Sequence, residues 1–267
     1  MLSLLKAIVM PKFPSKSGSE YFIYGKHPVL AAIKNPARKI NKLFLTAKSQ
    51  QELQNQQEIF KIIKAKNIPI KILTNQEISH LLQGDIKHQS FLLNTEPLQI
   101  KDANYIFNEI RQDSIDKLLI LDQLTDPQNF GAIIRSAIAF GYENIIIARD
   151  NACKDSGIVA KASAGMLESS KIYQSNNLNS FIKELKKYEF WILGLDSHSK
   201  TKINQAPNYT KFALIIGNEG KGVRKLVKEN CDLLLNIPLS EKVESLNASV
   251  AAAISMFALA NNKITIL

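Results

Sequence analysis

The 267-residue sequence has few of the residues from which metal centres and disulfide frameworks are built. It contains two cysteines, Cys153 and Cys231, and four histidines, and none of these residues fall at a metal-ligand spacing. Two cysteines in a chain of this length are typical of a protein from a reducing compartment. We therefore expect a cytoplasmic protein with no metal site.

Long apolar runs are also missing. No stretch approaches the roughly 18 apolar residues that suggest a transmembrane helix. Residues 2–10 are apolar, but Lys6 interrupts them, Pro11 follows them, and no small-residue cleavage site is present. We expect neither a signal peptide nor a membrane span, and we expect residues 1–19 to form a flexible basic lead-in.

Acidic residues are in the minority, with 24 Asp and Glu against 34 Lys and Arg, so the formal net charge is +10. Most of the excess lies in residues 1–110, which hold 15 basic and 8 acidic residues. A positive field of this kind favours an anionic partner, and nucleic acid is the first candidate. Because the lysines are spread along the chain, an ordinary solvated surface remains the alternative.

Apolar runs and helical patterns alternate through residues 20–95 and predict a small α/β sandwich. Its strands are expected at residues 21–24, 42–45, 69–73 and 89–93, and its helices at residues 27–33, 50–66 and 76–82. Residues 96–114 are polar and weakly patterned, so we expect them to link two domains.

The alternation restarts near residue 117 with continuous apolar strands, which are typical of buried parallel sheets. Strands are expected at residues 118–121, 144–148, 190–195, 212–216 and 233–237, and helices at residues 131–140, 158–163, 181–187, 223–228 and 247–260. This order predicts that residues 115–267 form an α/β domain with helices on both faces of a parallel sheet.

Three segments of this second domain place polar residues where a strand gives way to a helix, which is where open α/β sheets bind ligands. The first segment reads LDQLTDPQNFGAIIRSAIAFG. We expect Gly131 to open its helix, so that Arg135 lies one turn into the helix and leans back toward the loop. Asn129 can cap this helix or face a ligand. A capped helix with a surface Arg gives the same pattern, but the apolar neighbours of Arg135 favour an anionic partner such as phosphate.

The second segment, GNEGKG, follows the strand at residues 212–216. Gly217, Gly220 and Gly222 permit tight turns and close backbone approach. The spacing matches neither a phosphate-binding P-loop nor a dinucleotide-binding loop. Glu219 lies between the glycines, where a carboxylate either accepts backbone hydrogen bonds or contacts substrate.

The third segment, IPLSEKVESLNASVAAAISMF, places Ser245 and Asn247 at the mouth of a helix. Such residues are as often N-caps as functional groups. The helix that follows carries no charge from residue 248 to residue 260, which is typical of a buried helix or a subunit interface. We therefore expect a homodimer, and we expect the three segments to form one composite site.

Together these segments resemble the SpoU (TrmH) family of RNA 2′-O-ribose methyltransferases. The resemblance extends to K-A-S-A-G at residues 161–165 and to Y-G-K-H-P-V at residues 24–29. It implies a C-terminal methyltransferase domain of the SPOUT class, an α/β fold with a trefoil knot around a parallel sheet. It also implies an N-terminal, L30e-like α/β domain in residues 20–95 that binds the RNA substrate.

The resemblance further implies that S-adenosylmethionine is the cofactor and that both subunits of a homodimer build the active site. Gly217, Ile237 and Leu246 match the family's cofactor-binding positions. Its catalytic or RNA-facing positions are matched by Asn129, Arg135, Glu219, Ser245 and Asn247.

The front domain is most similar to that of family members that methylate a guanosine of 23S rRNA, so we expect this RNA as the substrate. A tRNA ribose methyltransferase is the nearest alternative, and a non-catalytic RNA-binding factor of ribosome assembly is the other. Arg135 is expected to stabilise the developing alkoxide or to grip the adjacent phosphate, and the rest of the catalysis is expected from alignment of the reacting groups.

Overall fold

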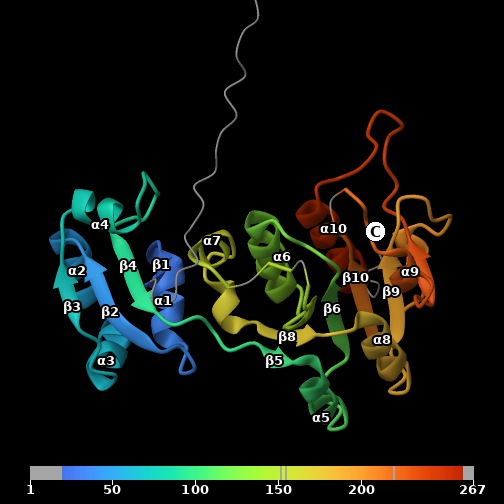
Figure 1. Ribbon diagram of the computed structural model, residues 1–267, viewed down its shortest axis with the longest axis horizontal. Helices are drawn as coiled ribbons and strands as arrows, with labels where there is room; N and C mark the ends of the chain where they lie inside the picture. Colours follow the sequence, from blue (N-terminus) through green and yellow to red (C-terminus); the bar gives the residue numbers. More distant parts are fainter. Residues whose placement is uncertain (1–19, 151, 154, 219, 261–267) are drawn as a thin grey trace, which may run out of the picture.

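The computed structural model describes residues 20–150, 152, 153, 155–218 and 220–260, and in it the chain folds around two sheets (Figure 1). The expected lead-in, residues 1–19, and the side chain of Glu219 lie outside this range. No helix of the described part is long and apolar enough to cross a membrane.

The front unit is a four-stranded sheet in the order β1-β4-β2-β3, with mixed strand directions. Its strands are β1 (Tyr21–Tyr24), β2 (Ile40–Leu45), β3 (Ile70–Ile72) and β4 (Phe91–Thr95). Its helices are α1 (Lys26–Lys34), α2 (Ala47–Gln54), α3 (Gln57–Ala65) and α4 (Asn75–Leu81).

The prediction of a single helix over residues 50–66 is wrong, because this stretch forms two helices, α2 and α3. Leu53 and Ile59 are both buried in the core. On a continuous helix, side chains six residues apart point about 120° away from each other, so an unbroken helix would not direct both toward the sheet equally. The break lets both face inward.

The second unit is a seven-stranded sheet in the order β11-β9-β10-β6-β7-β8-β5, in which every pair is parallel. The parallel α/β core predicted from the sequence is therefore confirmed. Its strands are β5 (Lys101–Asp102), β6 (Lys117–Leu121), β7 (Asn144–Ala148), β8 (Lys171–Ser175), β9 (Trp191–Leu195), β10 (Phe212–Ile216) and β11 (Leu233–Leu235). Two of them, β5 and β8, have no counterpart among the expected strands, and β5 lies in the segment expected to be a linker.

Helices cover both faces of this sheet, as expected. One face packs against α6 (Pro127–Ala139), α7 (Gly157–Ala162) and α10 (Ala248–Ala260). The opposite face packs against α5 (Ile106–Ile110), α8 (Leu178–Lys186) and α9 (Lys225–Lys228). Alternate residues of β6 divide between these two cores, Leu119 and Leu121 to the first and Leu118 and Ile120 to the second.

Helix α6 begins at Pro127, four residues before the expected start at Gly131. The Asp126 carboxylate caps the helix by accepting hydrogen bonds from the backbone amides of Gln128 and Asn129. Pro127 fits the first helical position, where no backbone N–H is needed. Asn129 is therefore not the cap. Arg135 lies more than two turns into the helix instead of one, and its side chain is exposed.

Gly131 lies inside α6 and packs this helix against α7. A Cβ atom there would lie 2.5 Å from the Ala162 Cβ and 2.8 Å from the Val159 carbonyl oxygen, so only glycine permits the approach. The residue that the sequence suggests as a helix start is a packing contact between two helices.

A buried arginine joins the two units. The Arg38 side chain is fully buried, and its guanidinium pairs with Glu168 at 2.6 Å and with Asp155 at 2.9 Å. Burial alone would lower the pKa of Arg38, but the Glu168 hydrogen bond and the two carboxylate charges outweigh it and raise that pKa. The front unit is thus fixed to the α7 region by a desolvated ion-pair network.

Candidate functional site

The three polar segments follow β6, β10 and β11, whose carboxyl ends lie at one edge of the parallel sheet. Strand β6 lies beside β10, so their loops are direct neighbours. The Asp122 amide donates to the Ile216 carbonyl oxygen at 2.8 Å, and Asn218 Nδ2 donates to the Gln123 carbonyl oxygen at 3.1 Å. The first and second segments are therefore held together by hydrogen bonds to their backbones.

An ion pair reinforces this junction. The Asp122 side chain is fully buried and accepts from the Arg224 amide at 2.9 Å and from Arg224 Nε at 2.7 Å. Sequence reasoning missed this pair, although an aspartate at the end of an apolar strand is an unusual residue to bury. Asp122 orients the end of the glycine-rich loop, where Arg224 precedes α9.

The glycine-rich segment closes on itself as a tight turn. Asn218 and Gly222 exchange two backbone hydrogen bonds of 3.1 and 2.8 Å, and Gly222 has a φ of +63°. A Cβ atom on Gly217 would lie 2.1 Å from the Gly222 carbonyl carbon, so the turn requires glycine there. The expected close backbone approach is thus an approach of the loop to itself.

Asn247 brings the third segment to the first. Its Oδ1 accepts from the Ser249 amide at 2.9 Å and so caps α10, while its Nδ2 donates to Asn129 Oδ1 at 2.9 Å. The two interpretations of Asn247, a helix cap and a site residue, are therefore compatible. The structure thus places two expected site residues, Asn129 and Asn247, in direct contact.

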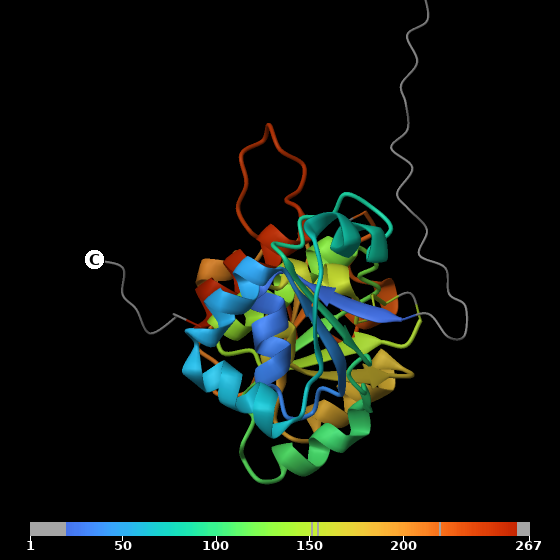
Figure 2. The same ribbon diagram turned by 90° about the vertical axis from the view of Figure 1, so that its left-hand side faces the viewer.

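The other expected residues that the structure describes are spread over α6, the end of β10 and the loop before α10. Arg135 is six residues beyond Asn129 on α6, which places it about 120° around the helix and about 9 Å along it. Ser245 is exposed on the loop that projects from the sheet edge before α10 (Figures 1 and 2). Ile237 and Leu246 are half-buried at the two ends of this loop, and Gly217 is buried at the end of β10.

Asn236, which sequence reasoning missed, ties the third segment to the loop after β9. Its backbone amide donates to the Thr201 carbonyl oxygen at 2.9 Å, and its backbone carbonyl oxygen accepts from the Ile203 amide at 2.8 Å. The Asn236 Oδ1 atom is buried and has no hydrogen-bond partner among the described residues. This atom can accept a hydrogen bond from water or from a bound ligand.

Charged metal ligands do not gather at this edge. Among the described residues, no three His, Cys, Asp or Glu side chains lie together as a metal site would require. Gly217, Ile237 and Leu246 offer backbone groups and apolar side chains, which suit an uncharged heterocycle better than a phosphate. The Asn236 Oδ1 atom adds an acceptor for an amino group.

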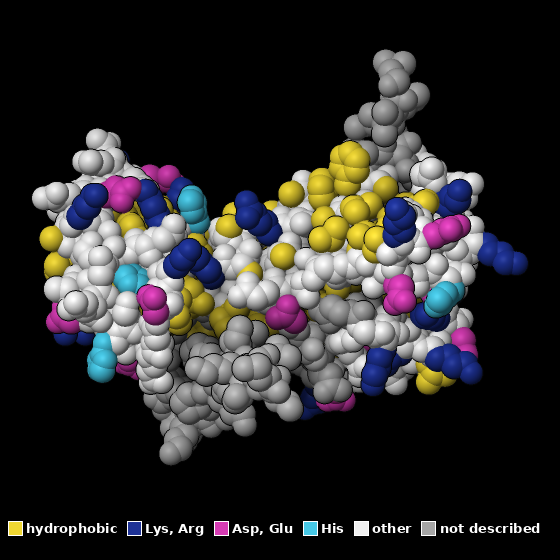
Figure 3. Space-filling model, turned by 90° about the horizontal axis from the view of Figure 1, so that it is seen from above, with side chains coloured by type: hydrophobic (Ala, Val, Ile, Leu, Met, Phe, Trp, Pro, Cys, Tyr) yellow, Lys and Arg dark blue, Asp and Glu magenta, His cyan; other side chains and the backbone are white. Residues whose placement is uncertain are grey.

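An apolar surface flanks the site. The inner side of α10 buries Ala248, Ala252 and Met256, whereas its outer side exposes apolar residues, as does the projecting loop. These exposed residues are Leu239, Val243, Val250, Ile254 and Phe257. Hydrophobic side chains gather on this face of the molecule (Figure 3), and we call these five residues the α10 patch.

Two family models match the chain. Residues 116–257 match the model described as the SpoU rRNA methylase family, and residues 22–101 match the model described as RNA 2′-O ribose methyltransferase substrate binding. The first match covers the three segments of the site, and the second covers the front sheet.

Named relatives span nearly the same length. A putative TrmH family tRNA/rRNA methyltransferase, YacO of Bacillus subtilis, is 32% identical over 88% of this chain and 93% of its own length. The 23S rRNA (guanosine-2′-O-)-methyltransferase RlmB of Coxiella burnetii is 33% identical over 88% of this chain and 93% of its own length.

The crystal structure of the SpoU methyltransferase AviRb from Streptomyces viridochromogenes in complex with AdoMet has a TM-score of 0.72 and 20% identity, and it covers 92% of this chain and 91% of that one. An AdoMet-bound rRNA methyltransferase from Sinorhizobium meliloti gives a TM-score of 0.73 at 20% identity, with 92% and 88% covered. At this identity the likeness establishes the fold.

Proposed function

The chain belongs to the SpoU rRNA methylase family, and from this premise we propose that it transfers a methyl group from S-adenosylmethionine to a ribose 2′-hydroxyl of RNA. The observation that carries the proposal is the meeting of three family segments at one sheet edge. Asn247 binds Asn129, and Asn218 binds the Gln123 carbonyl oxygen. Residues that lie 118 positions apart are thereby held in one surface.

The proposed substrate is a guanosine of 23S rRNA. Relatives named for this activity match nearly the whole chain, and the front unit matches a model for RNA substrate binding. Other relatives of similar identity are named only for tRNA or rRNA, so tRNA is the second candidate. A non-catalytic assembly factor is less well supported, because Asn129, Arg135 and Asn247 are all present.

Gly217, Ile237 and Leu246 would hold the cofactor through backbone groups and apolar contacts, and the buried Asn236 Oδ1 would accept a hydrogen bond from one of its amino groups. When bound, S-adenosylmethionine supplies an electrophilic methyl group on a sulfonium. The tight turn from Gly217 to Gly222 fixes the position of the backbone against which the cofactor would rest.

Arg135 is the proposed catalytic residue, with Asn129, Glu219, Ser245 and Asn247 orienting RNA and ribose. A guanidinium is protonated at neutral pH and is therefore a poor base. We assign Arg135 to gripping the phosphate next to the target ribose and stabilising the developing alkoxide. Its exposed position and lack of an ion pair with any described residue leave it available for an RNA phosphate.

A homodimer is part of the proposal. Arg135 and Asn129 lie about 120° apart around α6, an arrangement that suits a site completed by a second copy of the chain. A second copy docked on the α10 patch would bury exposed apolar side chains and bring its own Arg135 or its own loops to the shared site. The C-terminal trefoil knot, the L30e-like front domain (residues 20–95) and the cytoplasmic location follow from the same family membership and are proposed with it.

The test is a map of 2′-O-methyl groups in rRNA and tRNA from cells with and without the gene. Loss of one modification in 23S rRNA supports the preferred substrate, and loss of one in tRNA supports the second candidate. Identical maps would contradict the proposed function. Restoration of the lost modification by the wild-type gene is the control.

A further inference from the structure

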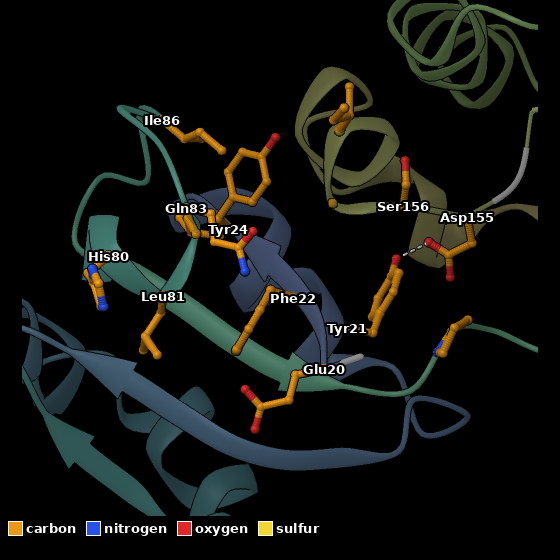
Figure 4. A pocket seen from close by; sticks show the side chains of 14 residues that line it. Glu20, Tyr21, Phe22, Tyr24, His80, Leu81, Gln83, Ile86, Asp155 and Ser156 are labelled. Atoms are coloured by element: carbon orange, nitrogen blue, oxygen red, sulfur yellow. Dashed lines mark hydrogen bonds between the residues drawn. The ribbon is translucent and has the colours of Figure 1, made fainter. Parts of the chain in front are cut away.

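A second site lies between the front unit and α7, away from the three segments. A cavity of about 690 Å³ opens there between β1, the turn after α4 and the start of α7 (Figure 4). Its size falls within the range of roughly 300–1,000 Å³ that is typical of ligand pockets. We call it the aromatic cleft, because one wall consists of Tyr21, Phe22 and Tyr24 of β1.

Both units hold the cleft in a fixed shape. The Tyr21 hydroxyl donates to the Asp155 carboxylate, and Arg38 pairs with the same carboxylate. A Cβ atom on Gly157 would lie 2.4 Å from the Phe22 carbonyl oxygen and 2.9 Å from Tyr24 Cε1, so the start of α7 lies directly against β1. The cleft is therefore present before any ligand arrives.

The Tyr24 hydroxyl is a polar group of the cleft that is open to a ligand. Tyr24 is only 7% exposed, and its hydroxyl forms no hydrogen bond with any described residue. The hydroxyl points into the space between the front unit and α7, and the side chain of Gln83 lies beside the ring (Figure 4). Burial raises the pKa of Tyr24, so its hydroxyl stays protonated and both donates and accepts hydrogen bonds.

The charges around the cleft define the ligand. None of the described residues that line it is Lys or Arg, so a phosphate group has no counter-charge from them inside. Of the two lining carboxylates, Asp155 is neutralised by Arg38, whereas Glu20 forms no ion pair with any described residue and would repel a phosphate. Cations lie nearby instead, because Lys87 follows the lining residue Ile86 and Lys161 donates to Gln89 Oε1 at 2.8 Å. A ligand with a neutral aromatic ring inside the cleft and phosphates outside it, near these lysines, matches this distribution of charge.

We propose that the aromatic cleft binds one unpaired nucleobase of the RNA substrate, with the ring against the β1 aromatics and the Tyr24 hydroxyl and Gln83 carboxamide on its polar edge. This inference rests on the proposed function for the identity of the polymer. Proteins that recognise single-stranded RNA stack splayed bases on aromatic side chains and read their edges by hydrogen bonds. The cleft thus selects an RNA segment with an unstacked base at a fixed distance from the methylation site.

The test compares binding of an oligouridylate, whose bases stack little, with binding of a blunt RNA duplex. Ile86→Trp fills the cleft, and Ile72→Trp places the same ring on β3 at the far edge of the front sheet, where Ile72 is 43% exposed. Wild type and Ile72→Trp are expected to prefer the single strand, and Ile86→Trp is expected to lose that preference while duplex binding is unchanged. Equal single-strand affinity of wild type and Ile86→Trp would overturn the proposal.

Tyr24→Phe removes one oxygen and tests the same site if the larger substitution disturbs folding. Loss of one hydrogen bond is expected to weaken oligouridylate binding about two- to tenfold without changing duplex binding, and unchanged binding would count against the site. Affinity for S-adenosylmethionine, measured by calorimetry, should be the same in all variants. None of these measurements requires methyl transfer. A wild-type protein without activity would contradict the proposed function, but the binding comparison would still confirm or overturn base binding in the aromatic cleft.

Discussion

Asn247 Nδ2 donates a hydrogen bond of 2.9 Å to Asn129 Oδ1, while Asn247 Oδ1 caps helix α10. Because the Ser249 amide can only donate, the atom that caps the helix must be the oxygen, and the amino group is left for Asn129. One side chain therefore begins a helix and joins the first and third segments of the site.

Asn247→Asp should separate these two roles. The carboxylate keeps the cap, so the melting temperature should change little, but it offers no donor to Asn129 and methyl transfer should fall. Asn247→Ala removes both roles and should also cost about 1 kcal/mol of stability. Kinetics and thermal melting of the two variants make the comparison, and full activity of Asn247→Asp would show that the contact is only structural.

Gly217→Ala should weaken S-adenosylmethionine binding by about tenfold or more, because its Cβ has no room beside the Gly222 backbone. Gly220→Ala is the matched control in the same loop, since the nearest atom to its Cβ, Asn218 Oδ1, lies 3.7 Å away. Calorimetry on folded variants is the measurement. Equal affinities would place the cofactor elsewhere.

Ile254→Glu should dissociate the proposed homodimer without unfolding the chain, because Ile254 is 38% exposed in the α10 patch. Ala252→Glu, two residues away, should unfold it, since Ala252 is fully buried and a buried unpaired charge costs several kcal/mol. Light scattering and circular dichroism distinguish the two outcomes. A wild-type protein that is monomeric at micromolar concentration contradicts the interface.

Arg38→Met should destabilise the protein by about 3–5 kcal/mol, because it leaves the buried Asp155 and Glu168 carboxylates without their counter-charge. The triple variant Arg38→Met, Asp155→Asn, Glu168→Gln should recover part of this loss. Urea unfolding measures both. If Arg38→Met alone is as stable as wild type, the network does not hold the two units together.

Arg135→Ala should lower the rate of methyl transfer by about a hundredfold or more, with cofactor affinity and stability nearly unchanged. The side chain is exposed and forms no ion pair with any described residue, so its removal leaves no buried group unpaired. Arg135→Lys keeps the charge without the planar fork and should recover only a small part of the rate. Wild-type rates in Arg135→Ala would remove this residue from the mechanism.

The sheet could be predicted from the sequence because its strands are local apolar runs. The meeting of three loops could be predicted because the carboxyl ends of parallel strands lie at one edge of a sheet. Continuous apolar strands such as β7 and β10 have their expected bounds, and parallel strands end at one edge. Strand β8 was missed because Lys171–Ser175 mixes polar and apolar residues, and β5 is too short to give a pattern.

What the sequence did not predict depends on contacts between distant residues. Nothing near Arg38 identifies Asp155 and Glu168 as its partners, and nothing near Asp122 identifies Arg224. The early start of α6 was signalled locally, by Asp126 as a cap and Pro127 at the first helical position, and it moves Arg135 to a different part of the helix.

Methyl transfer to RNA is tested most directly with S-adenosylmethionine labelled in its methyl group, in parallel reactions with unmethylated 23S rRNA and unmethylated tRNA, both transcribed in vitro. After nuclease digestion, the wild-type protein should yield label in a 2′-O-methylated nucleoside, guanosine for the preferred substrate, and Arg135→Ala should yield little or none. Label on a base, or no label transferred to either 23S rRNA or tRNA, would contradict the account.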